Sequence, residues 1–187
     1  VSHDLLLKFL RRSLEALGSV YSLLETSAMP LDARLQLLDV SHDRPRVSQN
    51  LGGMVFSNNL VRKSMANGIM VYNTTAVIDS TTVDSCAYNG IWGYPIATSN
   101  LTLTNSRLLN NGQYGLFVQD PAKISLLSNC DISRNGYSGV YVQNNSVALS
   151  VIGNTITNNV QHGLYVRALN DVQDTLLLIA GNKVRNN

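Results

Sequence analysis

The chain has little charge and no long apolar run. Only 14% of its 187 residues are Asp, Glu, Lys or Arg, and the net charge at pH 7 is +2. Such a small charge gives no strong attraction to nucleic acid or to a membrane surface. No apolar run approaches the ~18 residues that a membrane-spanning helix needs, so we expect no membrane span within this segment.

Cysteine and histidine are also scarce. Two cysteines are too few for a disulfide scaffold. Cys86 and Cys130 lie about two repeats apart by the arithmetic given below, roughly 10 Å at the usual strand spacing, which is too far for a bridge. We therefore expect two free thiols. The three histidines, His3, His42 and His162, lack the spacing of metal ligands, and we expect neither a metal nor another cofactor.

Asparagine is absent from residues 1–46, whereas residues 47–187 contain 21. This shift marks a change of architecture, which we place between a lead-in at 1–32 and repeats at 33–187. Ser2 is a typical helix cap and Gly18 a typical helix end. The leucines between them recur at helical spacing: Leu6, Leu10, Leu14 and Leu17. We expect this helix to cover the open end of the repeats; the alternative is that it docks onto a preceding domain.

From residue 58 onward the sequence repeats. We anchor each copy on its first apolar residue, and the successive spacings are 22, 25, 24, 24 and 28 residues. The anchors are Val61, Val83, Leu108, Ile132, Ile156 and Val184. A glycine stands seven residues after each of the first five anchors: Gly68, Gly90, Gly115, Gly139 and Gly163. A fixed period of this size indicates a stacked-repeat architecture. Because the chain ends inside a further copy and begins without an initiator Met or signal peptide, we expect a segment of a longer protein.

Each repeat contains short β-rich runs and no stretch that suits a helix. One run follows each glycine, as in Val140–Val142, and a second follows a polar break, as in Val147–Leu149. Both runs are bounded by Asn, Gly, Ser and Asp, the residues of turns. Three short strands per repeat of about 24 residues predict one coil of a parallel β-helix. We also expect a first strand within Leu35–Val40 and the second run of that coil at Gly53–Phe56.

Asparagines recur three residues after the anchors. Stacked coils place these side chains one above another, about 4.8 Å apart. Asparagine tolerates left-handed backbone, and its amide can bond to the copies above and below. We therefore interpret them as a structural turn ladder rather than as ligands: Asn111, Asn135 and Asn159, with Ser64, Cys86 and Asn187 at the equivalent places.

The segment Asn129–Val142, NCDISRNGYSGVYV, carries the pattern N-x-Φ-x-x-N-G-x-x-G-Φ-x-V. This pattern resembles the repeat of right-handed parallel β-helix proteins, a group that includes pectate lyases, alginate epimerases and nitrous-oxide-reductase accessory proteins. The coils also loosely resemble the β-helix segments of animal junction proteins of the bark beetle (anakonda) type. The resemblance spans about 33–187 and implies a right-handed solenoid of five to six coils.

The enzymes of this group, as the resemblance implies, act on acidic polysaccharides and use clustered carboxylates together with a basic residue. Here the acids of the repeats are sparse, and the Asp-Pro-His-Glu signature of alginate epimerases is absent. Arg107 and Asp131 each precede an anchor, so we expect them to stack as an exposed ion pair. A catalytic site of Arg107, Asp131 and Arg134 is the enzymatic alternative.

A column of large apolar residues follows the glycines. If strands alternate inward and outward, the second residue after each glycine faces outward. Stacked, these residues form a stripe ~20 Å long: Met70, Trp92, Phe117, Tyr141 and Tyr165. Two residues further on, a possible polar rim consists of Tyr72, Tyr94, Gln119, Gln143 and Arg167. A contiguous exposed patch usually marks a partner. Three interpretations stay open: cover by the helix or by the inserted loop at 167–175, contact with a protein or a second copy, and sugar stacking.

Three glycosylation sequons occur, at Asn73, Asn100 and Asn144. Together with the resemblance they favour an extracellular or cell-surface glycoprotein. We expect a rigid, non-enzymatic interaction or adhesion module, of the kind found at cell junctions, that binds protein partners or itself through the stripe. The alternative is a β-helix domain that binds polysaccharide or acts as a polysaccharide lyase or epimerase.

Overall fold

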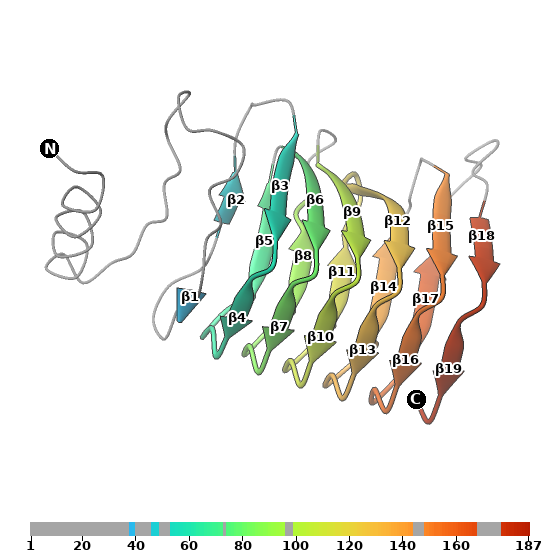
Figure 1. Ribbon diagram of the computed structural model, residues 1–187. Coiled ribbons are helices and arrows are strands. Elements are labelled where there is room, and N and C mark those ends of the chain that lie inside the picture. Colours follow the sequence, from blue (N-terminus) through green and yellow to red (C-terminus); the bar gives the residue numbers. More distant parts are fainter. Residues whose placement is uncertain are drawn as a thin grey trace, which may run out of the picture.

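The protein forms a stack of parallel coils in the computed structural model (Figure 1). The structure describes residues 53–72, 74–95, 99–143, 148–167 and 177–187, together with the backbone of two strands at 38–39 and 46–48. Each coil contributes one short strand to each of three parallel sheets that run the length of the stack. The prediction of three strands per repeat is confirmed.

The first sheet has seven strands and the other two have six each. The first sheet consists of β1 (Leu38–Asp39), β4 (Leu60–Arg62), β7 (Thr82–Asp84), β10 (Arg107–Leu109), β13 (Asp131–Ser133), β16 (Thr155–Thr157) and β19 (Lys183–Arg185). The second consists of β2 (Arg46–Ser48), β5 (Ile69–Tyr72), β8 (Ile91–Gly93), β11 (Leu116–Val118), β14 (Val140–Gln143) and β17 (Leu164–Arg167). The third consists of β3 (Met54–Ser57), β6 (Thr75–Asp79), β9 (Asn100–Thr104), β12 (Lys123–Ser128), β15 (Leu149–Ile152) and β18 (Leu177–Ala180).

The anchors of the repeat pair with one another in the first sheet, as their spacing predicts. Val61 pairs with Val83, and the register continues in the same way to Val184. The anchors from Val61 to Ile156 have no exposed surface. Apolar residues from the second and third sheets join them in one core that fills the coils.

The glycine of each repeat is required by the closeness of successive coils. A Cβ added at Gly115 would lie 2.6 Å from the carbonyl oxygen of Gly139 in the next coil, which is closer than such atoms approach. The backbone of one coil therefore lies directly on the glycine of its neighbour. This explains why the glycine recurs at a fixed offset although its φ angle is not positive.

The asparagine side chains form a continuous ladder through the stack. Asn111 Nδ2 donates to Asn135 Oδ1 at 3.0 Å, and Asn135 Nδ2 donates to Asn159 Oδ1 at 2.9 Å. The same oxygens also accept from the backbone N–H of the preceding coil, at 3.1 Å in both cases. All three side chains are buried. The ladder thus satisfies polar groups inside the turn that would otherwise be buried without partners.

One part of the turn prediction is wrong. The ladder asparagines do not adopt the left-handed conformation; the residue before each of them does, with φ between 54° and 58°. These left-handed residues are Lys63, Ser85, Asn110, Arg134, Asn158 and Asn186. Asparagine is selected at the ladder position by its amide bonds, and the left-handed turn is made one residue earlier by several residue types.

A second ladder lies on the other side of the first sheet, two residues before each anchor. Asn154 Nδ2 donates to Asn182 Oδ1 at 2.8 Å, and the Cys130 backbone N–H donates to Asn154 Oδ1 at 2.9 Å. Cys130 occupies a place in this ladder, as Cys86 does in the first one, where its N–H donates to Asn111 Oδ1 at 3.1 Å. Both thiols are free and buried, which confirms that they are unbridged.

The expected strand in Leu35–Val40 is present as β1, and Leu38 pairs with Val61. The run at Gly53–Phe56 is present as β3. The helical cap expected within 1–32 lies outside the described residues. In the part of the chain that is described, every regular element is a strand, and no helix there could cross a membrane.

Candidate functional site

The predicted stripe lies on the outer side of the second sheet. Trp92 pairs in register with Met70 and Phe117, and Tyr141 pairs with Phe117 and Tyr165. In β8, β11 and β14 the residues on either side of the aromatic one are buried. The column therefore consists of neighbouring side chains on successive coils, as alternation within the strands requires.

Exposure increases along this column toward the C-terminal coils. Met70 occupies the predicted register position but is buried, with 6% of its surface accessible, so it adds no open surface to the stripe. Trp92, Phe117 and Tyr141 are half-buried. Tyr165 is exposed at 38%. The open part of the stripe therefore begins at Trp92.

The rings form two groups in contact. In the first, Trp92 meets Tyr94 edge-on at 4.8 Å between ring centroids, and Tyr94 lies 5.1 Å from Tyr72. Tyr72 and Tyr94 stand at two positions of the possible polar rim, but their rings extend the aromatic surface. The indole nitrogen of Trp92 is buried without a hydrogen-bond partner among the described residues, so packing against Tyr94 holds this ring.

The second group is larger and contains three residues outside the predicted column. Tyr114 lies 5.1 Å from Phe117 and 5.4 Å from both Tyr137 and Tyr141. Tyr141 and Tyr165 stack at 5.1 Å with only 4° between their planes, and His162 stacks on Tyr165 at 5.2 Å. Tyr114 and His162 each precede a repeat glycine, at a position where the other repeats carry Asn or Ser, so the repeat gives no signal for them. We call both groups together the aromatic face: Tyr72, Trp92, Tyr94, Tyr114, Phe117, Tyr137, Tyr141, His162 and Tyr165.

The orientation of the rings limits what this face can bind. Tyr114 from the preceding coil and Tyr165 from the next coil both stack on Tyr141. The flat faces of the Tyr141 ring are therefore turned along the stack, toward other rings. Sugar stacking uses an exposed ring face, whereas ring edges and phenol hydroxyls are typical of protein contacts.

The rim beside the face is polar and carries little negative charge. Gln143 pairs in register with Arg167, and Gln119 directly follows β11. Of the four carboxylates among the described side chains, Asp120 alone is adjacent to this rim. The other three lie in strands of the first and third sheets: Asp79, Asp84 and Asp131.

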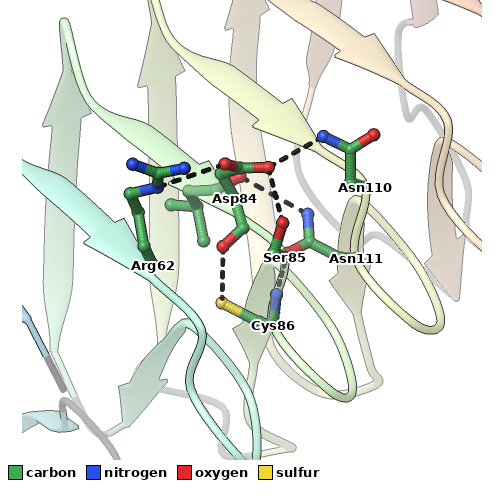
Figure 2. Close-up of polar contacts among 7 residues, drawn as sticks. Arg62, Asp84, Ser85, Cys86, Asn110 and Asn111 are labelled. Carbon is green, nitrogen blue, oxygen red and sulfur yellow. Dashed lines mark hydrogen bonds and ion pairs between the residues drawn. The ribbon is translucent and has the colours of Figure 1, made fainter. Parts of the chain in front are cut away.

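Asp84 and Asp79 are engaged in structural networks, and Figure 2 shows that of Asp84. Asp84 Oδ1 accepts from Asn110 Nδ2 at 2.8 Å and from Ser85 Oγ at 3.0 Å, and Asp84 Oδ2 lies 3.3 Å from Arg62 Nε. Burial opposes ionisation of Asp84, but the two hydrogen bonds and the charge of Arg62 outweigh it and lower its pKa. Asp84 is therefore a charged member of the turn network rather than a proton donor.

Asp79 behaves in the same way. Its carboxylate accepts from Thr104 Oγ1 and Asn105 Nδ2, each at 2.7 Å, and from Ser80 Oγ at 2.9 Å. The bond from Thr104 is the largest cause of its lowered pKa; desolvation acts in the opposite direction. Neither Asp79 nor Asp84 has the raised pKa that a general acid needs near neutral pH.

Of the three candidate catalytic residues, two form an ion pair and the third bonds to a turn asparagine. Arg107 Nε lies 3.7 Å from Asp131 Oδ2, and both side chains are substantially exposed, which confirms the predicted ion pair. Arg134 Nε instead donates to Asn110 Oδ1 at 2.9 Å. No group of three or more potential metal ligands occurs among the described side chains. The three residues are held by turn and surface contacts on the first sheet, away from the aromatic face.

The sequons are only partly covered by the structure. Asn100 lies in β9, and its Oδ1 atom is buried without a hydrogen-bond partner among the described residues. Asn73 and Asn144 lie outside the described residues, as does most of the loop at 167–175.

Comparison with known proteins identifies the family. The family model for the right-handed β-helix region matches residues 47–187. The chain belongs to the right-handed β-helix proteins. This confirms the handedness that the repeat pattern implied by resemblance. No curated protein sequence matches the chain significantly.

Two solved structures share the β-helix fold. A double mutant of the periplasmic alginate epimerase AlgG superposes with a TM-score of 0.58 at 17% identity, over 68% of this chain and 33% of the epimerase. A second structure of the same epimerase gives 0.51 at 13% identity, over 69% and 39%. The chain therefore spans little more than a third of these proteins' length, and identities this low establish a shared fold alone.

Proposed function

We propose that this β-helix is a non-enzymatic binding module that recognises a protein partner through the aromatic face, and that the partner to test first is a second copy of the chain. The observation that carries the proposal is the stacking of Tyr141 between Tyr114 and Tyr165, which gathers phenol groups from successive coils on one face and occupies the ring faces of Tyr141. A phenol hydroxyl both donates and accepts, so such a surface is complementary to itself.

The charge distribution supports the same proposal. A two-fold interface places each residue near its own copy or near a neighbour, and like charges there would repel. Within the aromatic face His162 is the one basic side chain, and Arg167 ends β17 at the rim. The stacked coils also hold the face rigid, which lowers the entropic cost of association.

The size of the face predicts weak association. From Tyr72 to Tyr165 the coils rise four times, roughly 19 Å, and with the turn residues before the strands the face is about six residues, roughly 20 Å, wide. This area is well below the ~800 Å² per partner of a standard stable interface. We therefore place the module among weak interactions that gain strength when several copies act together, as in adhesion at a cell surface. The periplasmic origin of the structurally similar epimerase supports a location outside the cytoplasm.

The test is a titration of the double variant Tyr141→Ser/Tyr165→Ser against wild type. Association that is present in wild type and lost in the variant supports the proposal. Tyr88→Ser is the matched control, because Tyr88 is exposed at 49% but belongs to neither ring group. Thermal melting of all three proteins shows whether the variant is still folded. Equal association of wild type and double variant would reject the role of the face.

An acidic polysaccharide is the second candidate ligand. Besides the fold that this chain shares with the epimerase, the charge of the coils favours it. Residues 53–187 contain eight Lys or Arg residues and six Asp residues, so the coils carry a small positive charge that is compatible with a polyanion. The test is incubation with alginate, pectate and hyaluronate, followed by product analysis and a binding measurement. Turnover that is lost in Arg107→Ala or Arg134→Ala would replace the first proposal with an enzymatic one.

A further inference from the structure

Four of the eight tyrosines of the chain lie in one cluster of the aromatic face. They are Tyr114, Tyr137, Tyr141 and Tyr165, and each has its ring centroid within 5.4 Å of another tyrosine of the set. The cluster brings oxidisable phenols into contact at a surface, and this raises the question of what chemistry they share.

Within this cluster Tyr141 and Tyr165 are the closest pair and the most nearly parallel one. Their centroids are 5.1 Å apart, their planes differ by 4°, and the two residues pair directly between β14 and β17. The backbone beneath them is fixed, because the adjacent turn carries the asparagine ladder from Asn135 to Asn159. The two rings are therefore held together for as long as the coils stay stacked.

We propose that Tyr141 and Tyr165 are a site of oxidative tyrosine coupling, which joins two successive coils by a covalent bond. Each phenol loses one electron and its hydroxyl proton and becomes a phenoxyl radical. A carbon ortho to one oxygen bonds to the ortho carbon of the other ring, and two ring protons move to the oxygens, which restores both phenols. The pair has then lost two electrons and two protons. One hydrogen peroxide, acting through a haem peroxidase as oxidant, takes them up and forms two waters.

The surroundings select this pair over the other tyrosines of the cluster. Tyr165 is exposed at 38%, so an oxidant can reach it, and a radical formed there has Tyr141 as its stacked neighbour. Tyr137 is also exposed, but its ring meets Tyr114 at 72° rather than in a stack. Burial, with smaller contributions from Tyr141 and Tyr137, raises the pKa of Tyr114, which disfavours the phenolate that one-electron oxidants attack most readily. The coupling requires no binding partner and is independent of the proposed function.

The experiment treats the protein with a haem peroxidase and hydrogen peroxide over a series of protein concentrations. Dityrosine fluorescence measures the yield, and denaturing gel electrophoresis separates cross-linked monomers from dimers. The tryptic peptide 135–167 contains both rings and no internal Lys or Arg. We expect this peptide to lose two hydrogens, with fragmentation that places the bond between Tyr141 and Tyr165, and we expect a monomer yield that does not depend on protein concentration.

Three single variants decide the outcome. Tyr165→Phe is expected to lower the monomer dityrosine signal at least about tenfold, whereas Tyr137→Phe and Tyr88→Phe are expected to retain it. Because each replacement removes only a hydroxyl, the fold should persist, and a thermal melt verifies this. The proposal is overturned if Tyr165→Phe leaves the signal unchanged, or if the wild type gives dityrosine only in dimers at a yield that rises with concentration. Loss of the signal in Tyr137→Phe instead would assign the coupling to another pair.

Discussion

The asparagine ladder gives the sharpest test of what stabilises the stack. Asn135 lies at its centre with no exposed surface. Its Oδ1 accepts from the backbone N–H and the Nδ2 of Asn111, at 3.1 and 3.0 Å. Its Nδ2 donates to the Leu108 carbonyl at 3.1 Å and to Asn159 Oδ1 at 2.9 Å. Replacement by alanine removes all four of these bonds and leaves their partners buried.

The expected loss follows from these bonds. A hydrogen bond within a protein contributes about 1 kcal/mol net, and more when its loss leaves a buried group without a partner. Four bonds therefore predict a decrease in the free energy of unfolding of about 4 kcal/mol for Asn135→Ala. Since whole domains are stable by only ~5–15 kcal/mol, this single change should bring the stack close to unfolding.

The assay is urea unfolding followed by circular dichroism, with Asn158→Gly as control. Asn158 is adjacent to the same ladder, but it is exposed and left-handed at φ 58°, a conformation that glycine adopts without strain. Its described side-chain contact is a long 3.5 Å bond to Thr157. We expect the control to change stability by no more than about 1 kcal/mol. If Asn135→Ala costs no more than this control, the ladder is not what holds the turns together.

Three further predictions concern other parts of the stack. Gly115→Ala should lower the melting temperature strongly, because its Cβ would lie 2.6 Å from the Gly139 carbonyl oxygen; an unchanged melt would show that the coils can separate at little cost. Cys86 and Cys130 should resist alkylation at pH 8 until urea is added, since burial raises the pKa of each thiol to about 11; rapid labelling of the folded protein would contradict this. Because the pKa of Asp79 is lower in the folded protein than its unperturbed value of 3.8, the ionised carboxylate stabilises the fold above pH 3.8, and this contribution disappears as the pH falls through the folded pKa. Asp79→Asn should therefore flatten the loss of urea resistance below about pH 4. An unaltered acid profile would refute this role.

The repeat could be predicted because stacking imposes one requirement on every coil. The anchors from Val61 to Val184 occupy the same register position, so each must be apolar. The glycines recur because the next coil leaves no room for a side chain. Insertions between these points, such as the 28 residues from Ile156 to Val184, lengthen the loops without altering the register. The pattern therefore survives in the sequence even where the copies have diverged.

The second ladder was missed because its occupants differ chemically. Thr81, Ser106 and Cys130 take places that Asn154 and Asn182 also take, since a backbone N–H can meet several kinds of side chain. The left-handed turn was misplaced for a similar reason. The structure tolerates even Lys63 and Arg134 at the strained position, so residue type alone does not mark it.

The candidate site was predictable as a column but not as a surface. Alternation along the strands selects Phe117, Tyr141 and Tyr165 directly. Tyr114 comes from the turn before its strand, at a position where other repeats carry Asn89 or Ser138, so no periodicity reveals it. The burial of Met70 is likewise a property of the assembled molecule, which no count along the chain supplies.

Sedimentation velocity over a concentration series tests the central claim, that the aromatic face is an association surface, most directly. We predict that the sedimentation coefficient of the wild type and of Tyr88→Ser rises with concentration, while Tyr141→Ser/Tyr165→Ser remains folded and monomeric throughout. A wild type that stays monomeric at every concentration, or a double variant that associates as the wild type does, would contradict the account.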